Sequence, residues 1–366
     1  SRIDSIIPTL ELLKNNQNKI FLISHFGRPE GKVEEKLSLH FLCEELRKKV
    51  KVSKIHFLKS FDNRDIIKKQ TEMNDGEICL FENIRFYKEE ETNDLEFSKN
   101  LSLNFDLYIN EAFSVSHRNH SSIVGIPNFL KSYAGLNFTK EIINLNTFLN
   151  KTKKPNLAIV GGSKISTKIK VIYNLINLFD VVVIGGAMAN TFLLANNIEI
   201  GKSLCEKNYI NVASDIQNEA KKKKCRFILP IDVVCGKALE NNEEILKCNI
   251  DKIPSDKIVL DIGEKTTNLI HNEIDKCNSV LWNGPLGAFE FTPFEKSSIE
   301  IAKKIKKSFK EINIEALAGG GDTLAVINLA NANDGFNYLS NAGGAFLEWL
   351  EGNKSPGFIA LEKNNF

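Results

Sequence analysis

The sequence lacks the marks of a membrane, secreted or strongly nucleic-acid-binding protein. Among its 366 residues, no apolar run is long enough to cross a bilayer, and no segment has the pattern of a secretion signal. Its formal net charge at pH 7 is only +2, so bulk electrostatics does not favour a nucleic-acid partner. We therefore expect a cytoplasmic protein with no membrane and no nucleic-acid partner.

Cysteine is present without a binding pattern. The chain has seven cysteines, an odd number, and no two of them are three positions apart. This spacing matches neither a zinc-binding cysteine pair nor the disulfide framework of a small secreted domain. Reduced thiols are the expected state.

Short apolar runs alternate with amphipathic segments along the whole chain. The alternation predicts parallel β-sheets with helices on both faces, and about a dozen such units exceed one sheet. Helical pattern follows most runs, for example over 40–49 and 168–179. The strand-like runs cover 20–24, 78–81, 107–109, 157–160, 181–184, 227–230, 279–282 and 314–318.

A change of domain is predicted near the middle of the chain. Residues 140–149 have helical pattern, and the polar stretch 150–155 follows before a fresh strand. We therefore expect an α/β protein with two doubly wound parallel-sheet (Rossmann-like) domains, joined by a connecting helix, with a cleft between them.

A glycine turn near the end of the chain predicts a phosphate site. Gly319, Gly320 and Gly321 follow an apolar run and precede a helical one, so the backbone is open and a helix N-terminus is close. Asp322 in the same turn would repel phosphate unless a cation such as Mg²⁺ lies between them. The alternative is a plain tight turn between a strand and a helix.

Further glycines of the second half stand at strand ends, where open parallel sheets bind ligands. Lys164 and Lys168 follow one such turn, and they share a helix face if the helix has begun there. Two ammonium groups beside a glycine turn suit a polyphosphate. The alternative is a pair of exposed helix lysines. The glycine turns are Gly161-Gly162, Gly185-Gly186, Gly284, Gly319–Gly321 and Gly343-Gly344.

The first half carries arginines and histidines at strand ends instead. The guanidinium group of arginine forms paired hydrogen bonds to carboxylate and phosphate groups. These residues therefore favour a pocket for a small, multiply anionic ligand. His117 and His120 have a spacing that metal ligands use, but no neighbouring cysteine or acidic partner supports a metal. The strand-end cationic residues are His25, Arg28, Arg85, His117, Arg118 and His120, with Arg2 at the start of the chain.

One half therefore suits a nucleotide and the other a small anion. No Ser-His-Asp set, carboxylate pair or catalytic cysteine suggests itself, and phosphoryl transfer needs mainly positioning and charge neutralisation. A carboxylate acceptor is already ionised at pH 7 and needs no general base. Closure of the two halves would exclude water from the transferring group.

From Arg2 to near its end, the chain closely resembles phosphoglycerate kinases. The resemblance implies a glycolytic kinase for the reversible reaction of 1,3-bisphosphoglycerate with ADP to give 3-phosphoglycerate and ATP, with Mg²⁺ as cofactor. It also implies a monomer with a hinge. The matching segments are Arg2-Ile3, Ser24–Pro29, Glu82–Phe86, Ala112-Phe113 with His117-Arg118, Gly161–Lys168, Trp282–Pro285, Phe289-Glu290 and Gly319–Thr323.

The resemblance also implies a role for each matching residue. The phosphoglycerate would be held by Arg2, His25, Phe26, Gly27, Arg28, Arg85 and Arg118. The nucleotide would contact Lys164, Lys168, Gly185, Gly186, Asn283, Glu290, Gly320, Gly321, Asp322 and Thr323, with Asp322 serving the metal. During transfer, the phosphoryl group would contact Arg2, Lys164, Lys168, Gly320, Gly343 and Gly344.

By the same resemblance, residues 1–138 form the phosphoglycerate-binding domain and 139–156 the connecting helix and linker. Residues 157–345 form the nucleotide-binding domain, and 346–366 return to the first domain.

Three departures from the family pattern stand out. The opening strand and its Asp-x-Asn loop are absent before Ser1, so we expect the first strand of the N-terminal sheet to be missing. Glu111 and Ser114 replace an Asp and a Gly, and Asn341-Ala342 replace Thr-Gly. The alternative function is therefore an N-terminally truncated, inactive member that only binds nucleotide. A dehydrogenase is disfavoured because no Gly-x-Gly-x-x-Gly follows a strand.

Overall fold

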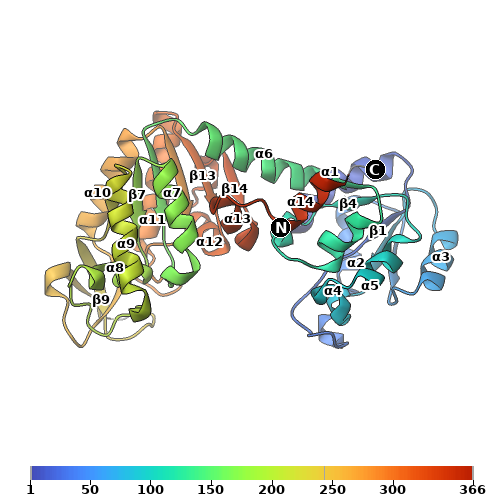
Figure 1. The fold of residues 1–366 in the computed structure, drawn as a ribbon, viewed down its shortest axis with the longest axis horizontal. Helices are drawn as coiled ribbons and strands as arrows, with labels where there is room; N and C mark the ends of the chain where they lie inside the picture. Colours follow the sequence, from blue (N-terminus) through green and yellow to red (C-terminus); the bar gives the residue numbers. More distant parts are fainter. Residues whose placement is uncertain (1, 243, 365–366) are drawn as a thin grey trace. The chain divides into compact units, whose positions relative to one another are not determined.

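The computed structural model describes residues 2–242 and 244–364, without the side chains of Arg2 and Lys151. The chain forms two compact units, drawn in Figure 1. The first unit comprises Ser1–Ile143 and Lys354–Phe366, and the second comprises Asn144–Asn353. Helix α6 (Leu136–Lys151) contributes residues to both units. The chain rejoins the first unit at Lys354, later than the sequence-based boundary at 346.

The second unit is built on a six-stranded parallel sheet. Its strand order is β14-β13-β12-β6-β7-β8. Strands buried on both faces read as continuous apolar runs, which is why Val181–Ile184 was recognisable in the sequence. The strands are β6 (Asn156–Val160), β7 (Val181–Ile184), β8 (Arg226–Ile228), β12 (Ser279–Asn283), β13 (Glu315–Gly319) and β14 (Tyr338–Ser340).

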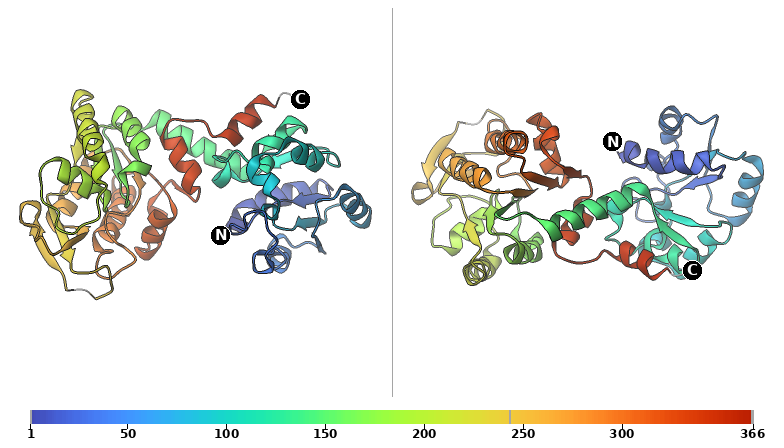
Figure 2. Two further views of the ribbon diagram at one scale, coloured as in Figure 1. Left: turned by 60° about the horizontal axis from the view of Figure 1, so that its bottom comes forward. Right: turned by 90° about the horizontal axis from the view of Figure 1, so that it is seen from above.

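Two helical layers cover this sheet, as Figures 1 and 2 show. Helices α10 (Glu264–Lys276), α11 (Lys296–Glu311) and α12 (Gly321–Leu329) pack side by side on one face, where Trp282 is fully buried among their side chains. The other layer consists of α7 (Ile169–Leu178), α8 (Met188–Ala195), α9 (Ile210–Lys222) and α13 (Gly343–Leu350). Each fully buried large apolar side chain contributes about 1.5–3 kcal/mol.

A small antiparallel sheet in the second unit was not predicted. Strand β9 (Asp232–Gly236) pairs with β10 (Leu246–Asn249) on one side and β11 (Ile258–Ile262) on the other. This antiparallel sheet is therefore an addition to the predicted parallel sheets. The three strands are joined by short connections, which suit antiparallel pairing.

The first unit has a three-stranded parallel sheet with the order β1-β3-β2 and a separate parallel pair, β4-β5. Apolar clusters lie on both faces of the larger sheet. The strands are β1 (Ile20–Leu22), β2 (Ile55–Leu58), β3 (Ile78–Phe81), β4 (Tyr108–Asn110) and β5 (Ser132–Ala134). The helices are α1 (Arg2–Asn15), α2 (Leu42–Val50), α3 (Asn63–Glu72), α4 (Lys88–Thr92), α5 (Leu95–Ser102) and α14 (Pro356–Lys363).

The predicted α/β class, with parallel sheets covered by helices on both faces, is thus confirmed. In Figure 2, the red C-terminal helix α14 lies beside the turquoise segment that follows β4, which it contacts at 121–128. None of the described helices is long and apolar enough to span a membrane.

The start of α6 is capped by Glu111, one of the departures from the family pattern. Its carboxylate accepts hydrogen bonds from the backbone N–H groups of Asn137 (3.1 Å) and Phe138 (3.0 Å). It also accepts one from the hydroxyl of Thr9 on α1 (2.5 Å). A carboxylate at a helix N-terminus contributes about 1 kcal/mol. Glu111 therefore fastens α1 and α6 to the end of β4.

Candidate active site

The glycine turns of the second unit gather at one edge of its sheet. Because β6, β7, β12, β13 and β14 run parallel, their carboxyl ends meet at the same edge. The turns at 161–162, 185–186, 284 and 319–321 follow four of these strands directly, and Gly343 opens α13 three residues beyond the end of β14. Open parallel sheets bind their ligands at this edge.

Three of these glycines are required by close backbone packing. A Cβ on Gly161 would lie 1.9 Å from the carbonyl oxygen of Pro285, and one on Gly284 would lie 2.3 Å from that of Gly161. Gly186 has a φ of +68°, and a Cβ there would lie 2.5 Å from the oxygen of Gly162. These glycines let the turns after β6, β7 and β12 interlock.

Two other glycines face open space at helix N-termini. A Cβ on Gly321 or Gly343 would meet no other atom within 4 Å. They are the first residues of α12 and α13, whose N-terminal N–H groups have no partner within the helix. The side chain of Asp322 is exposed beside the first of them. Protein packing does not require glycine at these two positions, so they leave room for an anionic ligand.

Alanine substitutions should separate these two classes of glycine. We expect Gly186→Ala to destabilise the protein by more than about 2 kcal/mol, because it creates backbone strain and a clash. Gly321→Ala should leave the stability unchanged or raise it by up to about 1 kcal/mol, since alanine favours a helix. Chemical denaturation of both variants checks this. A Gly321→Ala protein as unstable as Gly186→Ala would contradict the distinction.

Lys168 is held inward at the centre of this edge. Its ammonium group donates hydrogen bonds to the oxygen of Gly161 (2.8 Å), the backbone oxygen of Asn283 (3.0 Å) and the Asn283 side chain (2.5 Å). The Asn283 amide in turn donates to the oxygen of Gly319 (2.8 Å). Burial lowers the pKa of Lys168 to about 8, against a smaller opposing effect of Asp322. Lys168 and Asn283 together thereby link the carboxyl ends of β6, β12 and β13.

The idea that Lys164 and Lys168 share a helix face is wrong. A 3-10 turn (Ile165–Thr167) separates them, and α7 begins only at Ile169. Lys164 has extended backbone and an exposed side chain, whereas that of Lys168 is partly buried. The ammonium group of Lys164 is therefore open to solvent, whereas that of Lys168 is held within the turns.

The remaining residues assigned to the nucleotide are placed as follows. The side chain of Thr323 is buried, and its hydroxyl accepts a hydrogen bond from the N–H of Gly284 (2.7 Å), so it ties two turns together. Glu290 is exposed in the loop between β12 and α11. Gly185 follows β7, and its N–H donates to the oxygen of Val160 (2.9 Å). Gly320 precedes α12 with a φ of +100°, and Gly344 is exposed in the first turn of α13.

In the first unit, the strand-end loops are joined through Asn83 and Arg85. The Asn83 side chain donates to the oxygens of Phe26 (2.7 Å) and Leu37 (2.9 Å). Arg85 donates from Nη1 to the oxygen of Gly27 (2.8 Å). Gly27 has a φ of +66°, a conformation that favours glycine. The loop after β1 is thus fastened to the loop after β3.

The structure brings His25, Arg85 and Arg118 together into a cationic cluster. Burial and the charges of Arg85 and Arg118 lower the pKa of His25 to about 4, so its ring is neutral at pH 7. Two buried nitrogens, Nη2 of Arg85 and Nε of Arg118, lack hydrogen-bond partners within the described protein, whereas Nε of Arg85 lies 3.4 Å from the carboxylate of Glu91. Unpaired buried donors are costly, and an anion would satisfy them.

Sequence reasoning grouped His117 and His120 with the cationic residues of the first half, and both lie close to Arg118 in the sequence. The pKa of His117 is lowered chiefly by burial, and the nearby charges of Arg118 and His120 lower it further. His120 Nδ1 lies 3.5 Å from the buried carboxylate of Glu90. Within the described part of the chain, no group of three or more His, Cys, Asp or Glu residues is placed to hold a metal. Both histidines belong to the cationic cluster.

The other residues assigned to the phosphoglycerate are Phe26 and Arg28, in the loop whose Gly27 contacts Arg85, and Arg2. Arg28 is exposed, and Phe26 is exposed with its ring in edge contact with that of Phe41 (5.6 Å between centroids). Arg2 starts α1, but its side chain lies outside the described residues. Ser114 lies in a 3-10 turn and is not among the residues with positive φ, so it causes no strain there.

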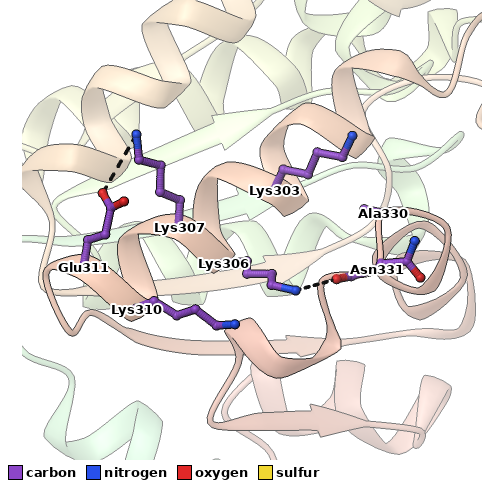
Figure 3. A pocket seen from close by; sticks show the side chains of 7 residues that line it. All are labelled: Lys303, Lys306, Lys307, Lys310, Glu311, Ala330 and Asn331. Atoms are coloured by element: carbon purple, nitrogen blue, oxygen red, sulfur yellow. Dashed lines mark hydrogen bonds and ion pairs between the residues drawn. The ribbon is translucent and has the colours of Figure 1, made fainter.

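A surface pocket of the second unit lies elsewhere and is shown in Figure 3. It is lined by Lys303, Lys306, Lys307 and Lys310 of α11 together with Glu311, Ala330 and Asn331. This part of α11 leads into the start of β13, opposite the edge with the glycine turns. Lys306 and Lys310 both pair with Asp334 (2.6 and 2.5 Å), so much of the charge is neutralised.

Comparison with known proteins identifies the family. A family model described as phosphoglycerate kinase matches residues 1–353. The chain belongs to the phosphoglycerate kinase family. Phosphoglycerate kinases of Chelativorans sp. (strain BNC1) and Brucella abortus biovar 1 (strain 9-941) are 42% and 41% identical to it, over 99% of this chain and 91% of their own length. The solved phosphoglycerate kinase of Coxiella burnetii is 33% identical, with a TM-score of 0.87, over 99% of this chain and 90% of that chain.

Membership of the phosphoglycerate kinase family assigns the chain kinase activity in glycolysis. The predicted family, function and enzyme class are therefore confirmed. The reading as an inactive member that only binds nucleotide is not favoured by these matches.

Proposed function

We propose that the cationic cluster of the first unit binds phosphoglycerate and that the glycine edge of the second unit binds Mg-nucleotide. The observation that carries the proposal is the pair of buried nitrogens without a partner in the described protein, Nη2 of Arg85 and Nε of Arg118. They require a ligand with several negative charges, and 3-phosphoglycerate has a phosphate and a carboxylate. Arg28, Phe26 and Gly27 line the same loop, and Arg2 is assigned to this ligand by the family resemblance.

For the nucleotide, the support is the pair of open helix N-termini at Gly321 and Gly343 together with Lys168. N-terminal N–H groups and the helix dipole favour phosphate oxygens. Lys164, exposed at the same edge, adds a second ammonium group. By the family pattern, Gly185 and Gly186 flank the adenine, and Glu290 contacts the ribose. Asn283 and the segment from Gly320 to Thr323 contact the phosphates. Gly343 and Gly344 contact the phosphoryl group that is transferred.

The residues present fit a metal that arrives with the nucleotide. Mg²⁺ is commonly held by one or two carboxylates together with phosphate oxygens and waters. Asp322 is a single exposed carboxylate beside the N-terminus of α12, so it would complete such a set without a protein cage. Bound there, Mg²⁺ would neutralise phosphate charge.

The transfer itself needs no protein acid or base. An oxygen of the ADP β-phosphate attacks the 1-phosphorus of 1,3-bisphosphoglycerate, and the bond from that phosphorus to the carboxyl oxygen breaks. The carboxylate leaves as an anion, and no proton moves. Lys164, Lys168 and Arg2 would neutralise the charge that spreads over the phosphoryl oxygens.

We also propose that the protein works as a cytoplasmic monomer whose two units close on a hinge during transfer. Ligands held on different units must meet, and water must be excluded. Small-angle scattering should show compaction when both substrates bind. Unchanged dimensions, or a dimer mass in light scattering, would contradict this part of the proposal.

Hydrogen exchange tests which unit holds which ligand. With 3-phosphoglycerate alone, we expect slower exchange of amides at 24–29, 83–86 and 113–120. With ADP and Mg²⁺ alone, the slowed amides should be those at 161–168 and 319–323. The assignment would be overturned if 3-phosphoglycerate slowed exchange at 161–168 and 319–323. It would also be overturned if neither ligand slowed exchange at its own set of amides.

Nucleotide binding should depend on pH through Lys168. Its pKa of about 8 in the free protein lies below the ordinary lysine value because of burial, and phosphate would raise it by favouring the charged form. Above about pH 8, binding should therefore take up to one proton, and affinity should fall by at most tenfold per pH unit. Calorimetry in buffers of different ionisation heat measures the uptake. The same uptake in Lys168→Met would show that another group is responsible.

A further inference from the structure

The 3-10 turn between the two lysines is held by a carboxylate from a distant part of the chain. Glu206 accepts hydrogen bonds from the backbone N–H of Ser166 (2.9 Å) and from its hydroxyl (2.7 Å). Forty positions separate the two residues in the sequence. The turn is Ile165–Thr167, so Glu206 binds the backbone between Lys164 and Lys168.

Glu206 is itself anchored to the protein interior. Its N–H donates to the hydroxyl of Thr191 (3.1 Å), a fully buried residue of α8. Two residues earlier, the oxygen of Leu204 accepts a hydrogen bond from the buried Asn190 side chain (3.0 Å). The segment that carries Glu206 is thus fixed to α8 at two points and has little freedom to follow the turn.

The turn transmits this fixed position to Lys168. The N–H of Lys168 donates to the oxygen of Ile165 (2.8 Å), and Ile165 is fully buried. The oxygen of Lys168 then accepts the N–H of Ile172 within α7 (2.9 Å). The backbone of Lys168 is therefore located by the turn on one side and by the helix on the other.

Hydrogen bonds and a nearby cation keep Glu206 ionised. The pKa of this carboxyl is lowered by the N–H and hydroxyl of Ser166, by the N–H of Ile165 and by the charge of Lys164, against the effect of burial. A carboxylate here occupies the N–H groups of the turn, which are then closed to a phosphate. Phosphate recognition is left to the lysine side chains and to the glycine turns.

We propose that Glu206 is a positioning residue for phosphoryl transfer. It holds the Ile165–Thr167 turn in one place and so sets where Lys164 and Lys168 stand relative to the nucleotide phosphates. This inference rests on the proposed function and deepens it. It gives Glu206, which lies between α8 and α9, a role in the transfer, although Glu206 itself is not assigned any contact with the substrate.

Steady-state kinetics of three variants tests this role. Glu206→Ala should lower kcat about 10- to 100-fold, because small misplacements of a charge-neutralising group are costly. The KM for 3-phosphoglycerate should stay within about twofold of its original value, since that ligand lies on the other unit. Glu206→Gln should recover most of the loss, because the amide can accept from the N–H of Ser166 and donate to its hydroxyl. Glu199→Ala, an exposed glutamate on the same connection, is the matched control and should be unaffected.

Each other outcome counts against the proposal. A Glu206→Ala protein with a lower melting temperature but unchanged kcat would make Glu206 a plain structural cap. A Glu206→Gln protein as slow as Glu206→Ala would mean that charge matters and position does not. If Glu206→Ala does not fold, Ser166→Ala removes one of the two hydrogen bonds and should lower kcat about three- to tenfold; an unchanged kcat would overturn the idea. Failure of the unmodified protein to form ATP would instead contradict the proposed function.

Discussion

Replacing Lys168 by alanine should lower kcat by about 10²- to 10³-fold, the usual cost of losing one preorganised charge or donor at a transferring group. In the ligand-free protein, its three hydrogen bonds go to Gly161 and Asn283. To reach a phosphate, the ammonium group must exchange at least one of them for a phosphoryl oxygen. Burial leaves this ammonium group poorly solvated and lowers its pKa to about 8, so it should gain strongly from a negative partner.

Lys170→Ala is the matched control for this experiment. Lys170 lies two residues further along, on an exposed position of α7, and should tolerate the change. Chemical denaturation of both variants separates a loss of activity from a loss of folding. A decrease of less than tenfold in kcat for a folded Lys168→Ala protein would refute its assigned role.

Arg118→Ala should raise the KM for 3-phosphoglycerate about 10- to 100-fold. Hydrogen bonds to charged groups contribute about 1.5–3 kcal/mol each, and Arg118 has a buried Nε with no partner in the described protein. The nucleotide KM should change little because the proposed nucleotide site lies on the other unit. The exposed Arg64, with 94% of its side chain accessible, provides the control substitution.

The same variant has a second readout that needs no substrate. Arg118 is one of the charges that hold the pKa of His25 near 4, so its removal should raise that pKa. An NMR titration of the His25 ring measures the change. An unchanged KM together with an unchanged His25 pKa would show that the two side chains do not share a site.

Much of the fold was visible in the sequence because most strands of the large sheet are buried on both faces. Such strands leave continuous apolar runs, and two predicted runs, 181–184 of the large sheet and 78–81 of the smaller sheet in the first unit, match the structure residue for residue. The antiparallel strands β9 to β11 were missed. Strand β10 alternates Leu246 and Cys248 with Lys247 and Asn249, a pattern too short and too polar to separate from a loop.

The candidate site was predictable where its chemistry is local. Glycines and cationic residues close after a strand signal a ligand edge, and this local pattern is why Gly321, Lys168 and Arg85 were candidates. The supporting residues were not predictable in this way. Asn83 and Glu206 act through hydrogen bonds to residues about 40 or more positions away, and no local pattern records such a partner. The inward hydrogen bonds of Lys168 likewise depend on three turns meeting in space.

The most direct test is to mix the purified protein with ADP, Mg²⁺ and 1,3-bisphosphoglycerate and to follow ATP and 3-phosphoglycerate by ³¹P NMR. We predict that both products appear in equal amounts, and that Lys168→Ala suppresses their formation while Lys170→Ala does not. A protein that binds ADP but forms no ATP would contradict the account.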